Sequence, residues 1–139
     1  MSDPIQQHEL KLDSTLASVD LAENIVVDAA RLLGLNEDQQ YEIGMAVRES
    51  MVNAVVHGNR HDPNKQVILT VQSEDGALSV VVEDEGEGLE MNTVADPTNG
   101  DNLLRSSGRG LLIIQAYTDE FAVERRQPRG TRVKIVKRR

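Results

Sequence analysis

Two hairpin signals on either side of a loop-like stretch constrain the fold of this chain more than any other feature. Each signal is a pair of short apolar runs joined by a turn: runs 67–71 and 78–82 around Glu74-Asp75-Gly76, and runs 121–125 and 131–136 around Gln127-Pro128-Arg129-Gly130. Glycine-containing turns between such runs are typical of antiparallel hairpins. We therefore expect four strands in two pairs, separated by a loop over about residues 86–108.

Helical patterns fill most of the remaining chain. Apolar residues recur at helical spacing over 19–33, and Asn36 is a suitable N-cap for a second helix that runs to about His57. A short helix is expected over 110–117, and the weak alternation at 8–12 indicates an edge strand. Because helices and strands are grouped instead of strictly alternating, the sequence predicts an α+β fold with a mostly antiparallel sheet and helices on one face.

Length and composition limit the classes of function. The 139 residues favour a single domain, 1–139, and the absence of cysteine excludes disulfides and thiol chemistry. No apolar run approaches the ~20 residues needed to span a bilayer, so we expect a cytoplasmic protein without a membrane partner. Only three aromatic residues are present, which leaves no stacking platform for single-stranded nucleic acid.

The net charge of −8 is unevenly distributed. Residues 1–123 carry 7 Lys+Arg and 22 Asp+Glu, whereas residues 124–139 carry 8 and 1. The acidic part argues against direct nucleic-acid binding, because phosphate contacts require a basic face. We interpret the basic segment 134–139 as a solvated strand with a frayed terminus, with a docking patch for an acidic partner as the alternative.

A polar row lies on the second expected helix. Glu49, Asn53 and His57 follow i, i+4 spacing and are expected to share one face, with apolar residues on both sides. A buried carboxylate and amide need partners. They are either satisfied by local hydrogen bonds, or they serve as a general base beside an amide oxygen that binds a metal. His57, at the helix end, is more readily structural than catalytic.

A second polar cluster, Asp84-x-Gly86-x-Gly88, directly follows the run 78–82. Glycines there allow a sharp turn and the close approach of a flat ligand, and a carboxylate can accept a hydrogen bond from an exocyclic amine. A solvated acidic turn and a calcium site are the alternatives, although the acidic run lacks the ligand spacing of an EF-hand.

The third cluster, Ser107-Gly108-Arg109-Gly110, opens the short helix expected over 110–117. The free N–H groups of a helix N-terminus bind phosphate when glycines let the ligand approach, and arginine adds a charged fork. The cluster is neither a Walker A loop nor a Rossmann fingerprint, because the lysine and the glycine spacing of those motifs are missing. A flexible loop before a helix is the alternative.

In this order the three clusters resemble the N, G1 and G2 boxes of the GHKL superfamily, which includes gyrase B, MutL and the histidine kinases. Within that superfamily the chain is most similar to the bacterial anti-sigma-factor serine kinases, over about residues 8–136. The resemblance implies a Bergerat-type ATP-binding fold, which is a two-layer α/β sandwich with a mixed, mostly antiparallel sheet. It also implies ATP and Mg²⁺ as cofactors.

The resemblance assigns the chemistry to the first cluster. Glu49 would be the general base that takes the proton from an attacking serine hydroxyl, and Asn53 would hold Mg²⁺ between the phosphates. His57 would belong to the nucleotide-binding set.

Nucleotide recognition would fall to the other two clusters. Asp84, helped by Thr131, would read the adenine amino group, while Gly86 and Gly88 shape the base pocket. The segment 89–107 would act as an ATP lid. The phosphates would be cradled by Ser107, Gly108, Arg109 and Gly110.

The implied function is an ATP-dependent protein-serine kinase that phosphorylates a STAS-type anti-sigma-factor antagonist and binds an RNA polymerase sigma factor, working as a homodimer. The alternative is a switch module that binds nucleotide and a partner without transferring phosphate. A histidine-kinase fragment is disfavoured because the chain lacks a dimerisation helix pair. Glu85 and Glu87 make the second cluster unusually acidic for a site that holds a polyanion, so we expect modest affinity.

Overall fold

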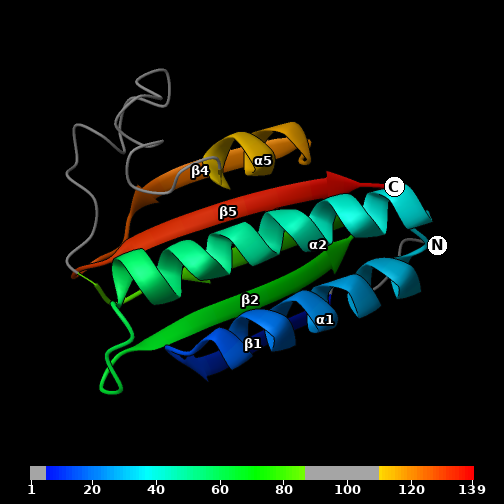
Figure 1. The fold of residues 1–139 in the computed structure, drawn as a ribbon. Coiled ribbons are helices and arrows are strands. Elements are labelled where there is room, and N and C mark those ends of the chain that lie inside the picture. The colour runs from blue at the N-terminus through cyan, green and yellow to red at the C-terminus, as the bar shows by residue number, and fades with distance from the viewer. Residues whose placement is uncertain (1–5, 87–109) are drawn as a thin grey trace.

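The structure is a computed structural model in which residues 6–86 and 110–139 are described. A five-stranded sheet forms one layer, and helices on one of its faces form the second (Figure 1). The strands are β1 (Gln6–Asp13), β2 (Gln66–Glu74), β3 (Ala77–Glu83), β4 (Glu120–Arg125) and β5 (Thr131–Arg138). The helices are α1 (Leu16–Leu33), α2 (Glu37–Val52), the π-helical turn η1 (Asn53–Gly58) and α5 (Gly110–Ala116). This arrangement confirms the predicted α+β class.

The strand order is β1-β2-β3-β5-β4, and every described pair of neighbouring strands is antiparallel. As expected, β1 is an edge strand. The strand that is last in sequence, β5, lies between β3 and β4, and its register pairs Arg132 with Glu83. The end of β3 therefore meets the start of β5, which places Asp84 beside Thr131.

The hairpin between β2 and β3 has the turn expected from the sequence. Asp75 and Gly76 both have positive φ, at 49° and 80°. Positive φ at both central residues matches the twist of the flanking strands, which is why this turn type is preferred in two-residue hairpins. Both predicted runs are confirmed as strands, and each strand extends beyond its run at both ends.

Side-chain caps fix the ends of the two long helices. Thr15 caps α1 by accepting from the Ser18 N–H, and Gly34 ends it with φ 97°. Asn36 caps α2 as predicted, and its capping box with Gln39 satisfies two N–H groups that the helix leaves free. No helix within 6–86 and 110–139 is long and apolar enough to cross a membrane.

An aliphatic core fills the space between the two layers. Alternate residues of the three central strands face the helices, as the period of two along a strand requires: Val67, Leu69, Val71, Leu78, Val80, Val82, Val133 and Ile135. α1 and α2 contribute one apolar stripe each, including Val26, Ile43, Val47 and Met51. This core holds the C-terminal end of α2 and the end of β3 in fixed relative positions.

The predicted helix reaches its expected stop at Gly58-Asn59, but its last turn is π-helical and not α-helical. The α-helix ends at Val52, and Asn53–Gly58 form η1. A π-helical turn contains more residues than an α-helical turn, so residues beyond Asn53 are rotated away from the expected i, i+4 row. Such π-turns occur frequently at functional sites.

The basic segment at the C-terminal end is a strand, as predicted, but it is not frayed. β5 remains paired to Arg138, and the Arg139 N–H donates to the Gly76 carbonyl (2.8 Å). Lys137 is buried with its Nζ 3.6 Å from a Glu42 carboxylate oxygen. The positive charges of this segment therefore serve largely to attach β5 to its surroundings.

Candidate functional site

The Asp84 carboxylate lies at the centre of the candidate site. It is 5% exposed and follows β3 directly. Its Oδ1 atom accepts hydrogen bonds from the backbone N–H groups of Gly86 (3.0 Å) and Thr131 (3.2 Å). The Asp84 N–H in turn donates to the Thr131 carbonyl (3.0 Å). The structure thus brings together three of the predicted site residues from two strand ends.

Three glycines allow the chain to close around Asp84. A Cβ atom on Gly86 would lie 2.1 Å from the Gly58 carbonyl oxygen, and one on Gly58 would lie 2.5 Å from Asp84 Cγ. Gly130 has φ 105°, and a Cβ there would lie 1.9 Å from the Asp84 carbonyl oxygen. Gly58 and Gly130 were not among the predicted site residues. Each adjoins a predicted residue or cluster, but their contact with Asp84 depends on the tertiary fold.

The environment of Asp84 shifts the pKa of its carboxyl group. Burial raises the pKa of this carboxyl above its ordinary value, while the two backbone hydrogen bonds and the charges of Arg126 and Lys65 oppose that rise in part. Within the described residues no group donates to the second oxygen, Oδ2. Oδ2 lies against Gly58, where an added Cβ would be 2.5 Å from it.

The acidic sequence suggested that the Glu85 charge would face the site, but its carboxylate is engaged elsewhere. Its carboxylate accepts from the backbone N–H of Gln66 (2.9 Å), at the start of β2. Its own backbone N–H donates to the side chain of Asn59 (2.8 Å). The Glu85 carboxylate therefore accepts the N–H group of Gln66 in place of a neighbouring strand. This contact explains one of the two acidic residues beside Asp84. Glu87 lies outside the described residues.

The first cluster lies where α2 passes into η1. Glu49 and Asn53 are both half-buried, and the Asn53 N–H donates to the carbonyls of Glu49 and Ser50. Among the described residues neither side chain has a hydrogen-bond partner, so the interpretation of a locally satisfied row is not supported. His57 is exposed, and the π-turn removes it from the row with Glu49 and Asn53.

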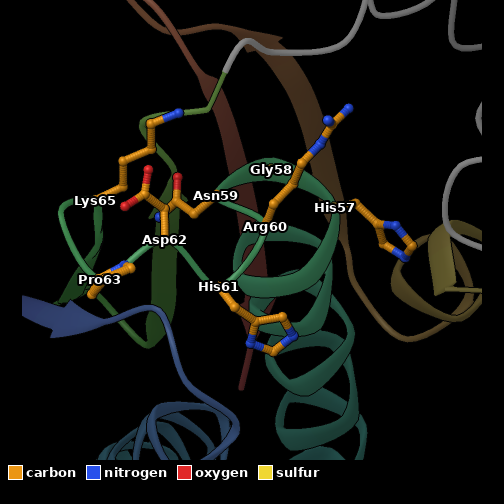
Figure 2. A pocket seen from close by; sticks show the side chains of 8 residues that line it. All are labelled: His57, Gly58, Asn59, Arg60, His61, Asp62, Pro63 and Lys65. Carbon is orange, nitrogen blue, oxygen red and sulfur yellow. The ribbon is translucent and has the colours of Figure 1, made fainter.

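A pocket of about 470 Å³ adjoins this junction. It is lined by residues of η1 and of the loop that follows: His57, Gly58, Asn59, Arg60, His61, Asp62, Pro63 and Lys65. Figure 2 shows His57 and His61 pointing in different directions, with Asp62 and Lys65 on the same side of the loop. Arg60 and His61 have left-handed backbones, at φ 52° and 57°, which non-glycine residues rarely adopt. Sequence reasoning did not anticipate this pocket.

The phosphate cluster falls mainly outside the described residues. Ser107, Gly108 and Arg109 lie outside them, as do Gly88 of the second cluster and the segment 89–107 that was predicted to act as a lid. Gly110 is the first residue of α5, in agreement with a helix that starts there. The phosphate-binding roles stay predictions.

The donor set suits a nucleotide-bound magnesium ion better than a metal held by protein alone. Within 6–86 and 110–139 no group of three or more His, Cys, Asp or Glu side chains is arranged to hold a metal. Mg²⁺ in nucleotide sites uses one or two protein oxygens and completes its shell with phosphates and water. The single amide oxygen of Asn53 fits that requirement.

One protein-family model and several known proteins are similar to this chain. Residues 12–137 match the family model of the histidine kinase-like ATPase domain. Anti-sigma F factors of Geobacillus thermodenitrificans and Geobacillus stearothermophilus are each 37% identical over 103 residues, which cover 72% of this chain and 70% of theirs. The anti-sigma F factor of Clostridium botulinum (strain Eklund 17B / Type B) is 29% identical over 104 residues, covering 73% of this chain and 72% of its own.

A solved structure of RsbU and RsbW domains from Mycobacterium tuberculosis has a TM-score of 0.68 at 18% identity. The match covers 96% of this chain and 32% of that one, so this chain spans about a third of its length. At this identity the likeness shows the fold alone. The family model and the relatives go further: the chain belongs to the histidine kinase-like ATPase domain family, in the branch that contains the anti-sigma F factors.

Proposed function

We propose that this chain is an ATP-dependent protein-serine kinase that phosphorylates an anti-sigma-factor antagonist and binds a sigma factor. The geometry of Asp84 is the observation that best supports nucleotide binding. One carboxylate oxygen is fixed by two backbone N–H groups, and the other, which has no donor among the described residues, would accept from the ligand. A fixed acceptor between close-packed glycines suits the 6-amino group of a flat adenine ring.

The positions of Glu49 and Asn53 support the chemical part of the proposal. Both are half-buried on the same helix end, which protects them from bulk water while leaving them reachable. The neighbouring Arg48 is bound to Asp20 (2.8 Å) and Glu23 (2.9 Å), so its charge is already paired with α1. Glu49 is thus available to take the proton from a serine hydroxyl as it attacks.

Phosphoryl transfer depends mainly on positioning and on neutralising charge, so a small number of protein groups suffices. Asn53 would hold Mg²⁺, which supplies charge neutralisation between the phosphates when it is bound. Asp84 orients the adenine base, and the Glu49 carboxylate is the proton acceptor. We assign the phosphates to Ser107, Gly108, Arg109 and Gly110, and also place His57 in the nucleotide-binding set.

The partners follow from the relatives. Their shared description as anti-sigma F factors supports a sigma factor as the sequestered partner. We propose a STAS-type antagonist as the serine substrate and a homodimer as the working form.

A phosphotransfer assay with the Glu49→Gln variant tests the kinase proposal. Wild-type protein with Mg-ATP and a candidate antagonist is expected to form phosphoserine, detected by mass spectrometry. Glu49→Gln removes the proton acceptor and keeps the side-chain shape, so we expect transfer to fall by about 10²–10⁴-fold, with ATP affinity nearly unchanged in calorimetry. The control variant is Arg48→Gln, at the adjacent residue. It breaks the ion pairs with α1 but leaves the Glu49 carboxylate in place.

Two other outcomes would change the assignment. If wild type binds ATP but phosphorylates none of the antagonists tested, the chain acts as a nucleotide-dependent switch. If Glu49→Gln retains full transfer, another residue is the base.

A further inference from the structure

We propose that Asn59 is a positioning residue that holds Asp84 where it can read the base of a bound adenine nucleotide, an inference that rests on the nucleotide-binding role proposed above. Asn59 is the first residue after η1, and it is 1% exposed. It lies outside the three polar clusters. A polar side chain buried this completely requires hydrogen-bond partners, and the identity of those partners indicates its role.

The Asn59 carboxamide joins three separate segments of the chain. Its Nδ2 atom donates to Ser14 Oγ (2.9 Å), between β1 and α1, and to the Gln66 carbonyl (3.0 Å), at the start of β2. Its Oδ1 atom accepts from the backbone N–H of Glu85 (2.8 Å). Both amide protons and the oxygen are therefore in use, which only a correctly oriented Asn provides at this position.

The bond to Glu85 fixes the chain immediately beyond Asp84. On one side the Asp84 N–H is held by the Thr131 carbonyl of β5, and on the other side the Glu85 N–H is held by Asn59. The Asp84 carboxylate is thereby restrained from two directions. The contact between Gly58 and Gly86 also depends on this spacing, because no room remains there for even a Cβ atom.

Asn59 also connects the two functional halves of the site. It directly follows η1, which begins at Asn53, while its oxygen holds the turn that contains Asp84. The position of Asp84 relative to Asn53 is therefore set partly by this one side chain. A purely structural role for Asn59 predicts lower stability in its variants, but it does not predict a change in base selectivity.

Base selectivity is measured with ATP and inosine triphosphate, which carries a carbonyl in place of the 6-amino group. Loss of one hydrogen bond to a charged acceptor changes affinity by about 10- to 100-fold, so wild type is expected to prefer ATP by that ratio in titration calorimetry. In Asn59→Ala the carboxylate is no longer held in register. We expect the preference to fall by about fivefold or more, mostly through weaker ATP binding.

Two further variants make the result decisive. Leu35→Ala, in the core at the connection of α1 and α2, is a control that destabilises the fold without touching Asp84, and it should keep the wild-type preference. Ser14→Ala removes one of the three Asn59 contacts, together with the hydrogen bond from Ser14 Oγ to the Lys65 carbonyl. It should lower the preference in the same direction by a smaller amount, and it is the deciding variant if Asn59→Ala does not fold.

An unchanged preference in folded Asn59→Ala, or in Ser14→Ala when Asn59→Ala fails to fold, overturns the role of Asn59. Failure of the proposed nucleotide-binding role would be seen with the wild-type protein. If wild-type protein binds no ATP, or binds both nucleotides equally, then the assignment of Asp84 to adenine fails before Asn59 is tested.

Discussion

At the scale of single residues, Asp84 concentrates most of the interactions that define the site. Its position at the end of a strand followed by glycines was predictable, because the apolar run 78–82 and the glycine spacing are local signals. Its contact with Thr131 was expected only through the family resemblance, since it requires β5 to lie beside β3. Asn59 was missed as a site residue because two of its three partners, Ser14 and Glu85, lie far from it in the sequence.

The variant Asp84→Asn tests the base contact. The amide oxygen can still accept from Gly86 and Thr131, but the amide N–H₂ group then faces the donor on adenine. We expect ATP affinity to fall by about 10- to 100-fold while the fold is kept. Calorimetric titration with circular dichroism measures both, and unchanged ATP affinity would remove Asp84 from the binding site.

The same variant tests the pH dependence of stability. Burial raises the pKa of Asp84 in the folded state above its ordinary value near 3.8. The folded protein therefore binds this proton more tightly than the unfolded chain, so the contribution to stability is full below pH 3.8 and is lost as pH rises through the folded pKa. Urea unfolding across this range should show wild type losing stability relative to Asp84→Asn as pH rises. A constant difference would contradict the shift.

At the scale of elements, the junction between α2 and η1 is where the sequence and the structure diverge most. The apolar spacing of residues 43–56 fits an α-helix throughout, and no local signal marks the change at Asn53. The π-turn is instead associated with tertiary contacts, since it ends at Gly58, which packs against Asp84 and Gly86. Helix position and N-cap were predictable, whereas the form of the last turn was not.

Gly58→Ala tests this contact. The added Cβ would lie 2.5 Å from Asp84 Cγ, so the end of η1 and the Asp84 turn must separate. We expect a loss of about 1–3 kcal/mol in the free energy of unfolding and a clear loss of ATP affinity. Gly44→Ala is the matched control, because its Cβ would meet a Val27 methyl group of α1 at 2.9 Å, away from the site. Equal ATP affinity in the two variants would show that η1 does not contribute to nucleotide binding.

At the scale of the whole molecule, the charge asymmetry of the sequence has a largely structural explanation. Basic side chains of the last strand pair with acidic ones across the sheet and helices, as in the pairs Lys137 with Glu42 and Arg138 with Glu120. Arg139 Nη1 donates to the Leu33 carbonyl (3.0 Å), and Gln39 Nε2 donates to the Arg138 carbonyl (3.0 Å). Composition revealed the imbalance, but the partners are too distant in sequence to be predicted.

Removal of residues 137–139 tests that explanation. The deletion breaks the attachment of β5 to α1, α2 and the β2–β3 hairpin, at the end of β3 opposite Asp84. We expect a loss of about 2–4 kcal/mol in the free energy of unfolding, because the deletion removes hydrogen bonds to Gly76, Leu33, Gln39 and Asp119 and the partly buried ion pair of Lys137 with Glu42. ATP affinity of the folded protein should remain. Lys134→Ala, at an exposed position of the same strand, controls for the loss of positive charge.

The central position of β5 has a consequence for biosynthesis. A growing polypeptide that has emerged only as far as β4 holds β1, β2 and β3, but it lacks the strand that joins β3 to β4 and supplies Thr131 to Asp84. The carboxylate is then without one of its two backbone donors. The hydrogen bonding that fixes Asp84 is therefore completed only after β5 has emerged and paired with β3.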